Sequence, residues 1–117
     1  MSRLLLMALL PFSATACAAA AASLEPAPAR RAELVNMVRQ DCGSCHGMRF
    51  KGGLGPPLLP DDLRGKPVDG LVLTVLDGRP GTAMAGWRPF MSEAEARWIV
   101  QKLMSGFPEL EARGQGN

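Results

Sequence analysis

The feature that most constrains this chain is the run Cys42-Gly43-Ser44-Cys45-His46. Two cysteines separated by two residues and followed at once by a histidine form the pattern at which haem is attached in the c-type manner. Each thiol can add across a haem vinyl group, and the adjacent imidazole can bind the iron as an axial ligand. His46 is the only histidine among the 117 residues, which excludes a bis-histidine haem. We therefore predict one covalently attached haem c per chain, held by Cys42, Cys45 and His46.

Two plainer interpretations of the same cysteines deserve comparison. A thioredoxin-like redox dithiol needs a βαβ context, and the sequence shows no such pattern. A structural zinc site needs two further ligands, and no second histidine is present to supply one. A haem that survives acid-acetone extraction would exclude both interpretations together.

The first 22 residues have the composition of a signal peptide. Arg3 supplies the positive end, residues 4–12 form a short apolar run, and small residues follow up to Ala22. The apolar run is well short of the roughly 18 residues that a membrane helix needs. We predict a signal peptide over residues 1–22, export to the periplasm, and no membrane span. Cys17 leaves lipoprotein anchoring open, because a lipoprotein signal also places a cysteine after small residues.

The remaining residues, 23–117, are predicted to form a single mono-haem domain with a structured core over about 30–107. The formal charge of the chain is +2, and loss of Arg3 with the signal peptide leaves about +1. This balance argues against a nucleic-acid partner, and we expect a monomer. A domain this small buries only a modest core of its own, so a haem wrapped by the chain would contribute much of its stability.

Apolar spacing predicts an all-α fold of three to four short helices wrapped around the haem. Residues 23–29 are expected to be an exposed leader, and a helix from Arg30 to Asp41 then delivers the cysteines at its end. A short helical turn is predicted within 61–68. Residues 71–76 are predicted to form a helix that ends at Gly78, although so short an apolar run is also compatible with a buried strand.

The last helix has the clearest boundaries. Ser92 and Glu95 have the spacing of a capping box at its start, and Gly106 and Pro108 end it. Its expected buried stripe consists of Ala96, Ile99, Val100, Leu103 and Met104, with Trp98 beside it. The polar residues 109–117 are predicted to be a frayed tail.

The glycine- and proline-rich stretch 48–60 is predicted to be a loop. Within it, the dipeptide Gly55-Pro56 is placed so that a backbone carbonyl can accept the second N–H of His46. Such a bond fixes the orientation of the ring and makes the imidazole a stronger donor to iron.

The sixth iron ligand has to come from elsewhere, and we favour Met84. It lies in a loop among small residues, which allow the loop to lie flat on a porphyrin: Gly81, Ala83, Ala85 and Gly86. Met91 and an open site remain as alternatives. Methionine ligation raises the reduction potential and suits electron transfer, whereas an open site suits gas sensing or catalysis. Thr82 is expected to hold the loop or to hydrogen-bond to a haem propionate. Trp87 is expected to pack on the haem edge, to donate its indole N–H to a propionate, or simply to pack in the core.

Taken together, these motifs resemble the class I cytochromes c, and more narrowly the NirC-type, or cytochrome c-55X, family. The narrower resemblance rests on the runs 39–48, 51–56, 76–82, 87–90 and 92–100. It implies a periplasmic carrier, not an enzyme, that donates single electrons to the dissimilatory nitrite reductase containing haem c and haem d. It also implies an upstream periplasmic or membrane donor and dependence on the cytochrome c maturation machinery. A role in haem d maturation or insertion is the alternative within the same family.

One departure from the family concerns the residue after the ligand methionine. The family tends to have proline there, whereas this chain has Ala85. Because proline stiffens a loop by fixing φ, its absence is expected to loosen the attachment of Met84 to iron.

Four basic residues lie in the segments expected to surround the exposed haem edge: Arg49, Lys51, Arg79 and Arg88. They are predicted to form a basic rim that steers docking to a partner. The alternative is that they are scattered solvated charges with no common role.

Overall fold

The computed structural model describes residues 25–111, so the predicted signal peptide, with Cys17, lies outside the described residues. The described part is helical and contains no β-strand. Its elements are α1 (Pro28–Met37), the π-helical turn η1 (Val38–Cys42), α2 (Gly43–His46), α3 (Pro60–Leu63), α4 (Val68–Asp77), α5 (Glu93–Ser105) and α6 (Pro108–Glu111). No helix within 25–111 combines the length and the apolar character needed to cross a membrane. The predicted all-α fold is confirmed.

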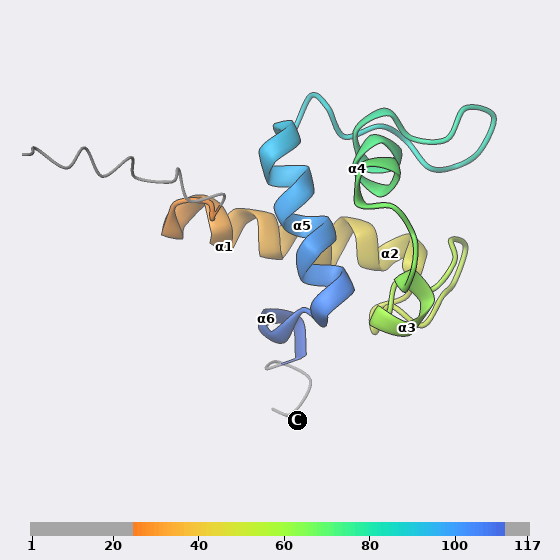
Figure 1. Ribbon diagram of the computed structural model, residues 1–117, viewed down its shortest axis with the longest axis horizontal. Coiled ribbons are helices and arrows are strands. Elements are labelled where there is room, and N and C mark those ends of the chain that lie inside the picture. Colours follow the sequence, from red (N-terminus) through yellow and green to blue (C-terminus); the bar gives the residue numbers. More distant parts are fainter. Residues whose placement is uncertain (1–24, 112–117) are drawn as a thin grey trace, which may run out of the picture.

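The elements α1, η1 and α2 follow one another without a break and form a long N-terminal rod that α5 crosses (Figure 1). The rod begins at Pro28 and not at Arg30 as predicted. Proline has a backbone φ already suited to the first helical turn, where its missing N–H costs no bond. The predicted end at Asp41 is also wrong, because the helical backbone continues through both cysteines to His46.

The predictions for α4 and α5 are confirmed. The apolar run 71–76 is helical and ends where Gly78 adopts a φ of 69°. At the start of α5, the Ser92 hydroxyl accepts from the Glu95 amide at 3.2 Å, and the Glu95 carboxylate accepts from the Ser92 amide at 2.8 Å. This reciprocal pair is a capping box.

The core lies where α5 packs against α4 and α3 and crosses the N-terminal rod. Its most deeply buried side chains come from all three long elements: Leu34, Val38, Val72, Leu76, Ala96 and Ile99. Trp98 is also buried, and its ring meets that of Phe107 edge-on with centroids 5.7 Å apart. The stripe predicted for the last helix is therefore its buried face, with Met104 at the partly buried margin.

The predicted frayed tail is wrong at its start, because Pro108–Glu111 forms the short helix α6. Two contacts tie Glu109 to the rest of the domain. Its carbonyl accepts from Arg39 at 2.8 Å, and its carboxylate pairs with Lys102 at 3.1 Å. Leu110 packs against the core in addition. The contact with Arg39 has no local sequence signal, since Arg39 lies 70 positions earlier in the chain.

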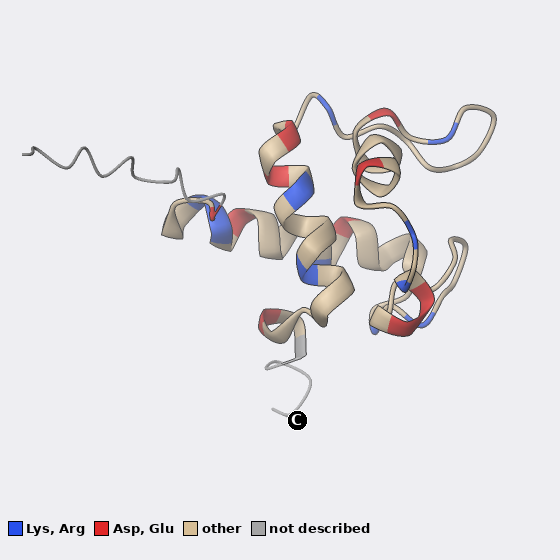
Figure 2. Ribbon diagram, in the orientation of Figure 1, with Lys and Arg blue, Asp and Glu red and all other residues tan. Residues whose placement is uncertain are grey.

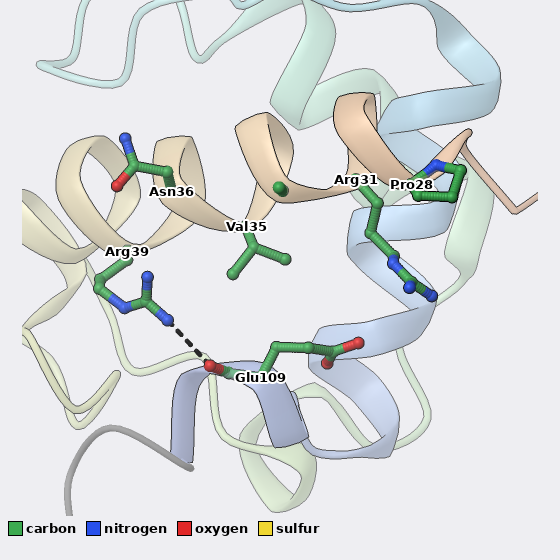
Figure 3. Close-up of a pocket in the computed structure, with 7 residues that line it drawn as sticks. Pro28, Arg31, Val35, Asn36, Arg39 and Glu109 are labelled. Carbon is green, nitrogen blue, oxygen red and sulfur yellow. Dashed lines mark hydrogen bonds between the residues drawn. The ribbon is translucent and has the colours of Figure 1, made fainter. Parts of the chain in front are cut away.

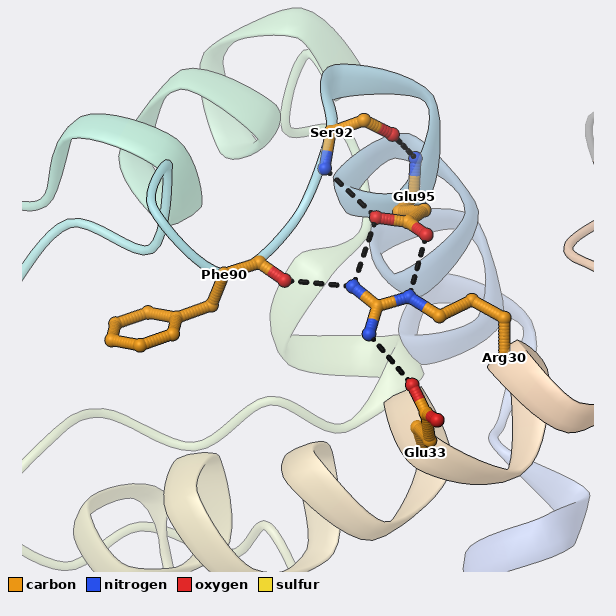
Figure 4. Close-up of polar contacts among 5 residues, drawn as sticks. All are labelled: Arg30, Glu33, Phe90, Ser92 and Glu95. Atoms are coloured by element: carbon orange, nitrogen blue, oxygen red, sulfur yellow. Dashed lines mark hydrogen bonds and ion pairs between the residues drawn. The ribbon is translucent and has the colours of Figure 1, made fainter.

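A cluster of polar contacts around Arg30 joins the start of α1 to the start of α5 (Figure 4). The guanidinium donates to Glu95 at 2.7 Å and 3.2 Å, and to Glu33 at 2.9 Å. It also donates to the carbonyl of Phe90 at 2.7 Å, at the end of the segment that follows α4. Glu95 therefore takes part in both the helix cap and the contact between the two helices.

We expect Glu95→Gln to lower the stability of the haem-loaded domain by about 1 kcal/mol at neutral pH, because glutamine retains the capping geometry but not the charge. Hydrogen bonds from Arg30 hold the pKa of Glu95 below its usual 4.5. A carboxylate with a lowered pKa stabilises the fold above its unfolded pKa and loses this contribution as the pH falls. The difference between wild type and variant should therefore close below about pH 4, as measured by chemical unfolding.

The matched control is Glu93→Gln, two residues earlier, where the carboxylate is largely exposed and lies 3.6 Å from Arg97. We expect a much smaller effect there. A Glu95→Gln deficit of the same size at pH 7 and at pH 3 would show that the charge on Glu95 is not the stabilising feature.

Candidate haem-binding site

The end of the N-terminal rod places both cysteines and the histidine within little more than one helical turn. Cys42 is the last residue of η1, and Cys45 and His46 lie in α2. Residues three apart on a helix lie on the same face, so the Cys42 and Cys45 side chains emerge together. Both thiols are free and partly buried. The Ser44 hydroxyl donates to the Asp41 carbonyl at 2.7 Å and lies 3.8 Å from the Cys45 sulfur.

The π-helical turn immediately before the motif has no counterpart in the sequence prediction. Residues 38–42 follow the wider π pattern, which adds one residue to the turn. Such turns are short, unusual and frequent at functional sites. The turn changes the angular position of every side chain after it, so it determines the direction in which Cys42, Cys45 and His46 project from the rod.

The thiol of Cys42 has the properties of a buried, neutral group. Burial raises the pKa of Cys42 to about 11, and the neighbouring Asp41 carboxylate adds to the shift. Redox dithiols and reactive cysteines have the opposite character, with a pKa below the ordinary value. The structure therefore gives no support to the dithiol interpretation. Among the described residues there is also no cluster of three or more histidine, cysteine or acidic side chains placed to bind a metal ion.

The imidazole of His46 is buried and held through one nitrogen. Nδ1 lies 2.7 Å from the carbonyl oxygen of Pro56. A carbonyl can only accept, so the proton of a neutral ring is on Nδ1, and Nε2 has its lone pair free for a metal. The predicted carbonyl partner of His46 is confirmed as Pro56.

The loop that supplies this carbonyl is bound to the motif by main-chain hydrogen bonds. The amide of Gly55 donates to the Cys45 carbonyl at 2.8 Å, and the amide of Gly52 donates to the His46 carbonyl at 2.8 Å. These two bonds satisfy carbonyls at the end of α2 that have no partner within the helix. The loop and the motif thus form one unit in which the orientation of the histidine ring is fixed.

Met84 lies in the segment between α4 and α5, and this segment is attached to the end of α4. The Trp87 amide donates to the Val75 carbonyl at 3.0 Å, and the Arg79 amide donates to the Met84 carbonyl at 3.0 Å. Gly78 is needed at this crossing, because a Cβ there would collide with the Met84 carbonyl oxygen. The Met84 side chain itself is partly buried and is not part of the core cluster.

Thr82 supports this segment in the way proposed for it. Its hydroxyl donates to the Arg79 carbonyl at 2.7 Å and accepts from the Met84 amide at 3.2 Å. Trp87 packs against the core, with its ring centroid 5.4 Å from that of Phe90. Met91, the alternative ligand, is buried in the core with only 6 % of its surface exposed.

The structure brings His46 and Pro56 together, whereas Met84 makes its hydrogen bonds within its own segment. The loop 47–59 and the segment 78–91 both extend from the side of the molecule on which α2 ends (Figure 1). The arrangement fits a haem: two free thiols emerge together, one histidine has an unengaged nitrogen, and glycine backbone lies beside its ring.

Two shallow hollows lie outside the predicted site. The larger, about 310 Å³, lies between the N-terminal rod and α6 (Figure 3) and is lined by Pro28, Arg31, Ala32, Val35, Asn36, Arg39 and Glu109. The smaller, about 290 Å³, lies beside the first half of α4 and is lined by Lys66, Pro67, Gly70, Leu71, Thr74 and Arg79. Neither includes Cys42, Cys45, His46 or Met84.

Comparisons with known proteins agree with the helical fold. A family model described as cytochrome C oxidase, cbb3-type, subunit III matches residues 26–101. Cytochrome c55X of Stutzerimonas stutzeri is 50% identical over 84 residues, which cover 72% of this chain and 74% of that protein. A solved structure of the c-type cytochrome NirC is 51% identical with a TM-score of 0.68, covering 70% of this chain and 96% of that one.

A further relative is much longer than this chain. The dihydro-heme d1 dehydrogenase of Pseudomonas aeruginosa is 41% identical over 73 residues, which cover 62% of this chain but only 15% of that protein.

Proposed function

The chain belongs to the cytochrome c55X family of c-type cytochromes, and from this premise we propose that it carries single electrons to the dissimilatory nitrite reductase in the periplasm. As a c-type cytochrome it is an electron-transfer protein and not an enzyme. Its family implies haem c as the cofactor. The proposal adds that one haem is attached per chain, and that the reductase is the acceptor.

Four residues would hold the group. Cys42 and Cys45 would form the two thioether bonds, and His46 Nε2 and Met84 Sδ would bind the iron. When bound, haem c would supply an iron that gives one electron to the reductase and receives one from an upstream periplasmic or membrane donor. The Pro56 carbonyl keeps the His46 ring in one orientation throughout.

The observation that best supports electron transfer is that hydrogen bonds hold the segment containing Met84 against the end of α4. Main-chain bonds from Arg79 and Trp87, together with the Thr82 hydroxyl, constrain its backbone even though Ala85 provides no proline stiffening. A methionine whose backbone is constrained in this way suits permanent ligation, and a haem ligated by histidine and methionine suits electron transfer better than gas binding.

The charge distribution is compatible with steered docking but less simple than predicted. Charges of both signs are spread over the molecule (Figure 2). Within residues 25–111, Arg49, Lys51 and Arg79 make no ion pair, whereas Arg88 pairs with Asp77 at 2.7 Å. We therefore assign the proposed basic rim to Arg49, Lys51 and Arg79, with Arg88 contributing less.

Electron transfer from the reduced protein to the purified reductase is the direct test. We expect rapid single-electron oxidation whose second-order rate falls several-fold as the salt concentration rises from about 0.02 M to 0.5 M, because salt screens long-range attraction. No electron transfer would contradict the proposed function, and a rate independent of salt would contradict the steering.

One observation favours a second function, assistance in haem d maturation or insertion. The dihydro-heme d1 dehydrogenase that this chain resembles over 73 residues is named for a reaction on a form of haem d. Deletion of the gene separates the two functions. Slow nitrite reduction with a full haem d content of the reductase supports electron donation, whereas loss of haem d from the reductase supports maturation.

A further inference from the structure

Gly55 lies so close to the imidazole of His46 that no side chain fits at this position. A Cβ built on Gly55 would lie 2.7 Å from Cε1, 2.8 Å from Nδ1 and 3.2 Å from Nε2 of the ring. Non-bonded heavy atoms of this kind are ordinarily about 3.5–4.0 Å apart. The glycine backbone is therefore in direct contact with the ring on the side that includes both nitrogens.

The backbone conformation does not account for the glycine. Gly55 is not among the described residues with positive φ, so its φ does not require a glycine. The three atoms nearest to a Cβ at this position all belong to the ring of His46. The glycine is thus a requirement of the histidine and not of the loop.

Gly55 is itself fixed in place. Its amide donates to the Cys45 carbonyl at 2.8 Å, and its own carbonyl accepts from Gly53 at 3.0 Å. The next residue, Pro56, binds Nδ1 of the ring. One dipeptide therefore sets two features of the ring: the Pro56 carbonyl sets the direction of Nδ1, and the Gly55 backbone limits movement of the ring toward the loop.

We propose that Gly55 is a positioning residue for the axial imidazole: its missing side chain sets the position of the His46 ring, and thereby how strongly Nε2 binds the haem iron. The proposal rests on the proposed role of His46 as an axial ligand. It assigns to Gly55 an effect on the redox chemistry that is separate from any effect on folding.

Gly55→Ala should displace the ring and lengthen the Nδ1–H···O bond to Pro56. A weaker bond makes the imidazole a poorer donor, which stabilises the ferric state less. We expect the reduction potential to rise, with about a tenfold shift in the ferric–ferrous equilibrium, equivalent to 59 mV for one electron. The low-spin ferric EPR g-values should move as well, because they depend on the orientation of the ring.

Gly70→Ala is the matched control. Gly70 lies in α4, outside the haem-binding motif, and its built Cβ meets only a ring carbon of Pro67, at 3.4 Å. We expect its potential and g-values to equal those of the wild type. A wild-type potential and spectrum in Gly55→Ala would overturn the positioning role, whereas a wild-type protein with no histidine-ligated low-spin haem would overturn the proposed site instead.

A measurement on the wild type covers the case in which Gly55→Ala does not accumulate as a haem protein. In the reduced, diamagnetic haem protein, we expect a nuclear Overhauser effect between the Gly55 Hα protons and His46 Hε1, because Gly55 lies against the Cε1 side of the ring. Its absence would overturn the proposal without any substitution.

Discussion

Replacing Met84 with alanine is expected to abolish the long-wavelength sulfur-to-iron charge-transfer band of the oxidised protein and to lower its reduction potential. Methionine sulfur stabilises the ferrous state, so its loss favours the ferric state. We expect a fall on the order of 0.2 V, a fraction of the roughly 0.8 V over which axial ligands set haem potentials. Absorption spectroscopy and voltammetry of the purified protein measure both effects.

The fold should survive this change. The Met84 side chain is outside the core cluster, and the hydrogen bonds of its segment are made by its backbone and by Thr82. A spectral change in Met84→Ala therefore reports on ligation and not on unfolding. Helical circular dichroism equal to that of the wild type would verify this point.

Met91→Leu is the contrasting variant. Met91 is buried, and a volume-conserving change of this kind usually costs less than about 1.5 kcal/mol of stability. We expect the charge-transfer band to remain in this variant. Loss of the band in Met91→Leu together with its survival in Met84→Ala would assign the ligand to Met91 and contradict the proposed site.

The second large effect is expected from the double variant Cys42→Ala/Cys45→Ala, which should have no acid-stable haem. Both sulfurs are free, so no disulfide in the described fold depends on them. Each single variant should retain at most one covalent bond. Acid-acetone extraction and the mass of the intact protein distinguish two, one and no attachments.

The double variant should also be less stable than the wild type, because it lacks the covalently attached haem. A domain of this size has a small core, and a bound group that binds only the native state stabilises it. Ser44→Ala, within the same motif, removes a hydroxyl that donates to the Asp41 carbonyl at 2.7 Å and more distantly to the Cys45 sulfur at 3.8 Å, but it leaves both thiols in place and should leave attachment unchanged. Acid-stable haem in the double variant would show that the cysteines are not the attachment points.

Much of this architecture is encoded in short-range patterns. Ser92 and Glu95 predict the start of α5 because a capping box involves residues only three apart, and Gly78 predicts the end of α4 because few other residues adopt its φ. The pairing of His46 with Pro56 is similarly local, at ten positions. In these cases the interaction that determines the structure can be seen directly in the sequence.

Some of the features that were not predicted depend on distant parts of the chain, and others have no distinctive local sequence. The contact of Arg30 with Glu95 spans 65 positions and that of Arg39 with the Glu109 carbonyl spans 70, so neither has a local signature. The π turn over 38–42 has no distinctive composition. Gly55 could be recognised only as a loop glycine, because its particular role depends on where the His46 ring lies.

The hydrogen bonds between the loop and the end of α2 also bear on the order in which the chain folds. They connect residues 45–46 with residues 52–56, so the segments to be brought together are separated by only a short stretch of chain. Closing so short a loop costs little entropy. The contact between α1 and α5 costs more, because it closes a loop of 65 residues. We therefore expect the histidine ring to be oriented while the C-terminal helix is still undocked. The maturation machinery would then meet a chain that already presents its iron ligand and is still open on the side where Met84 later arrives.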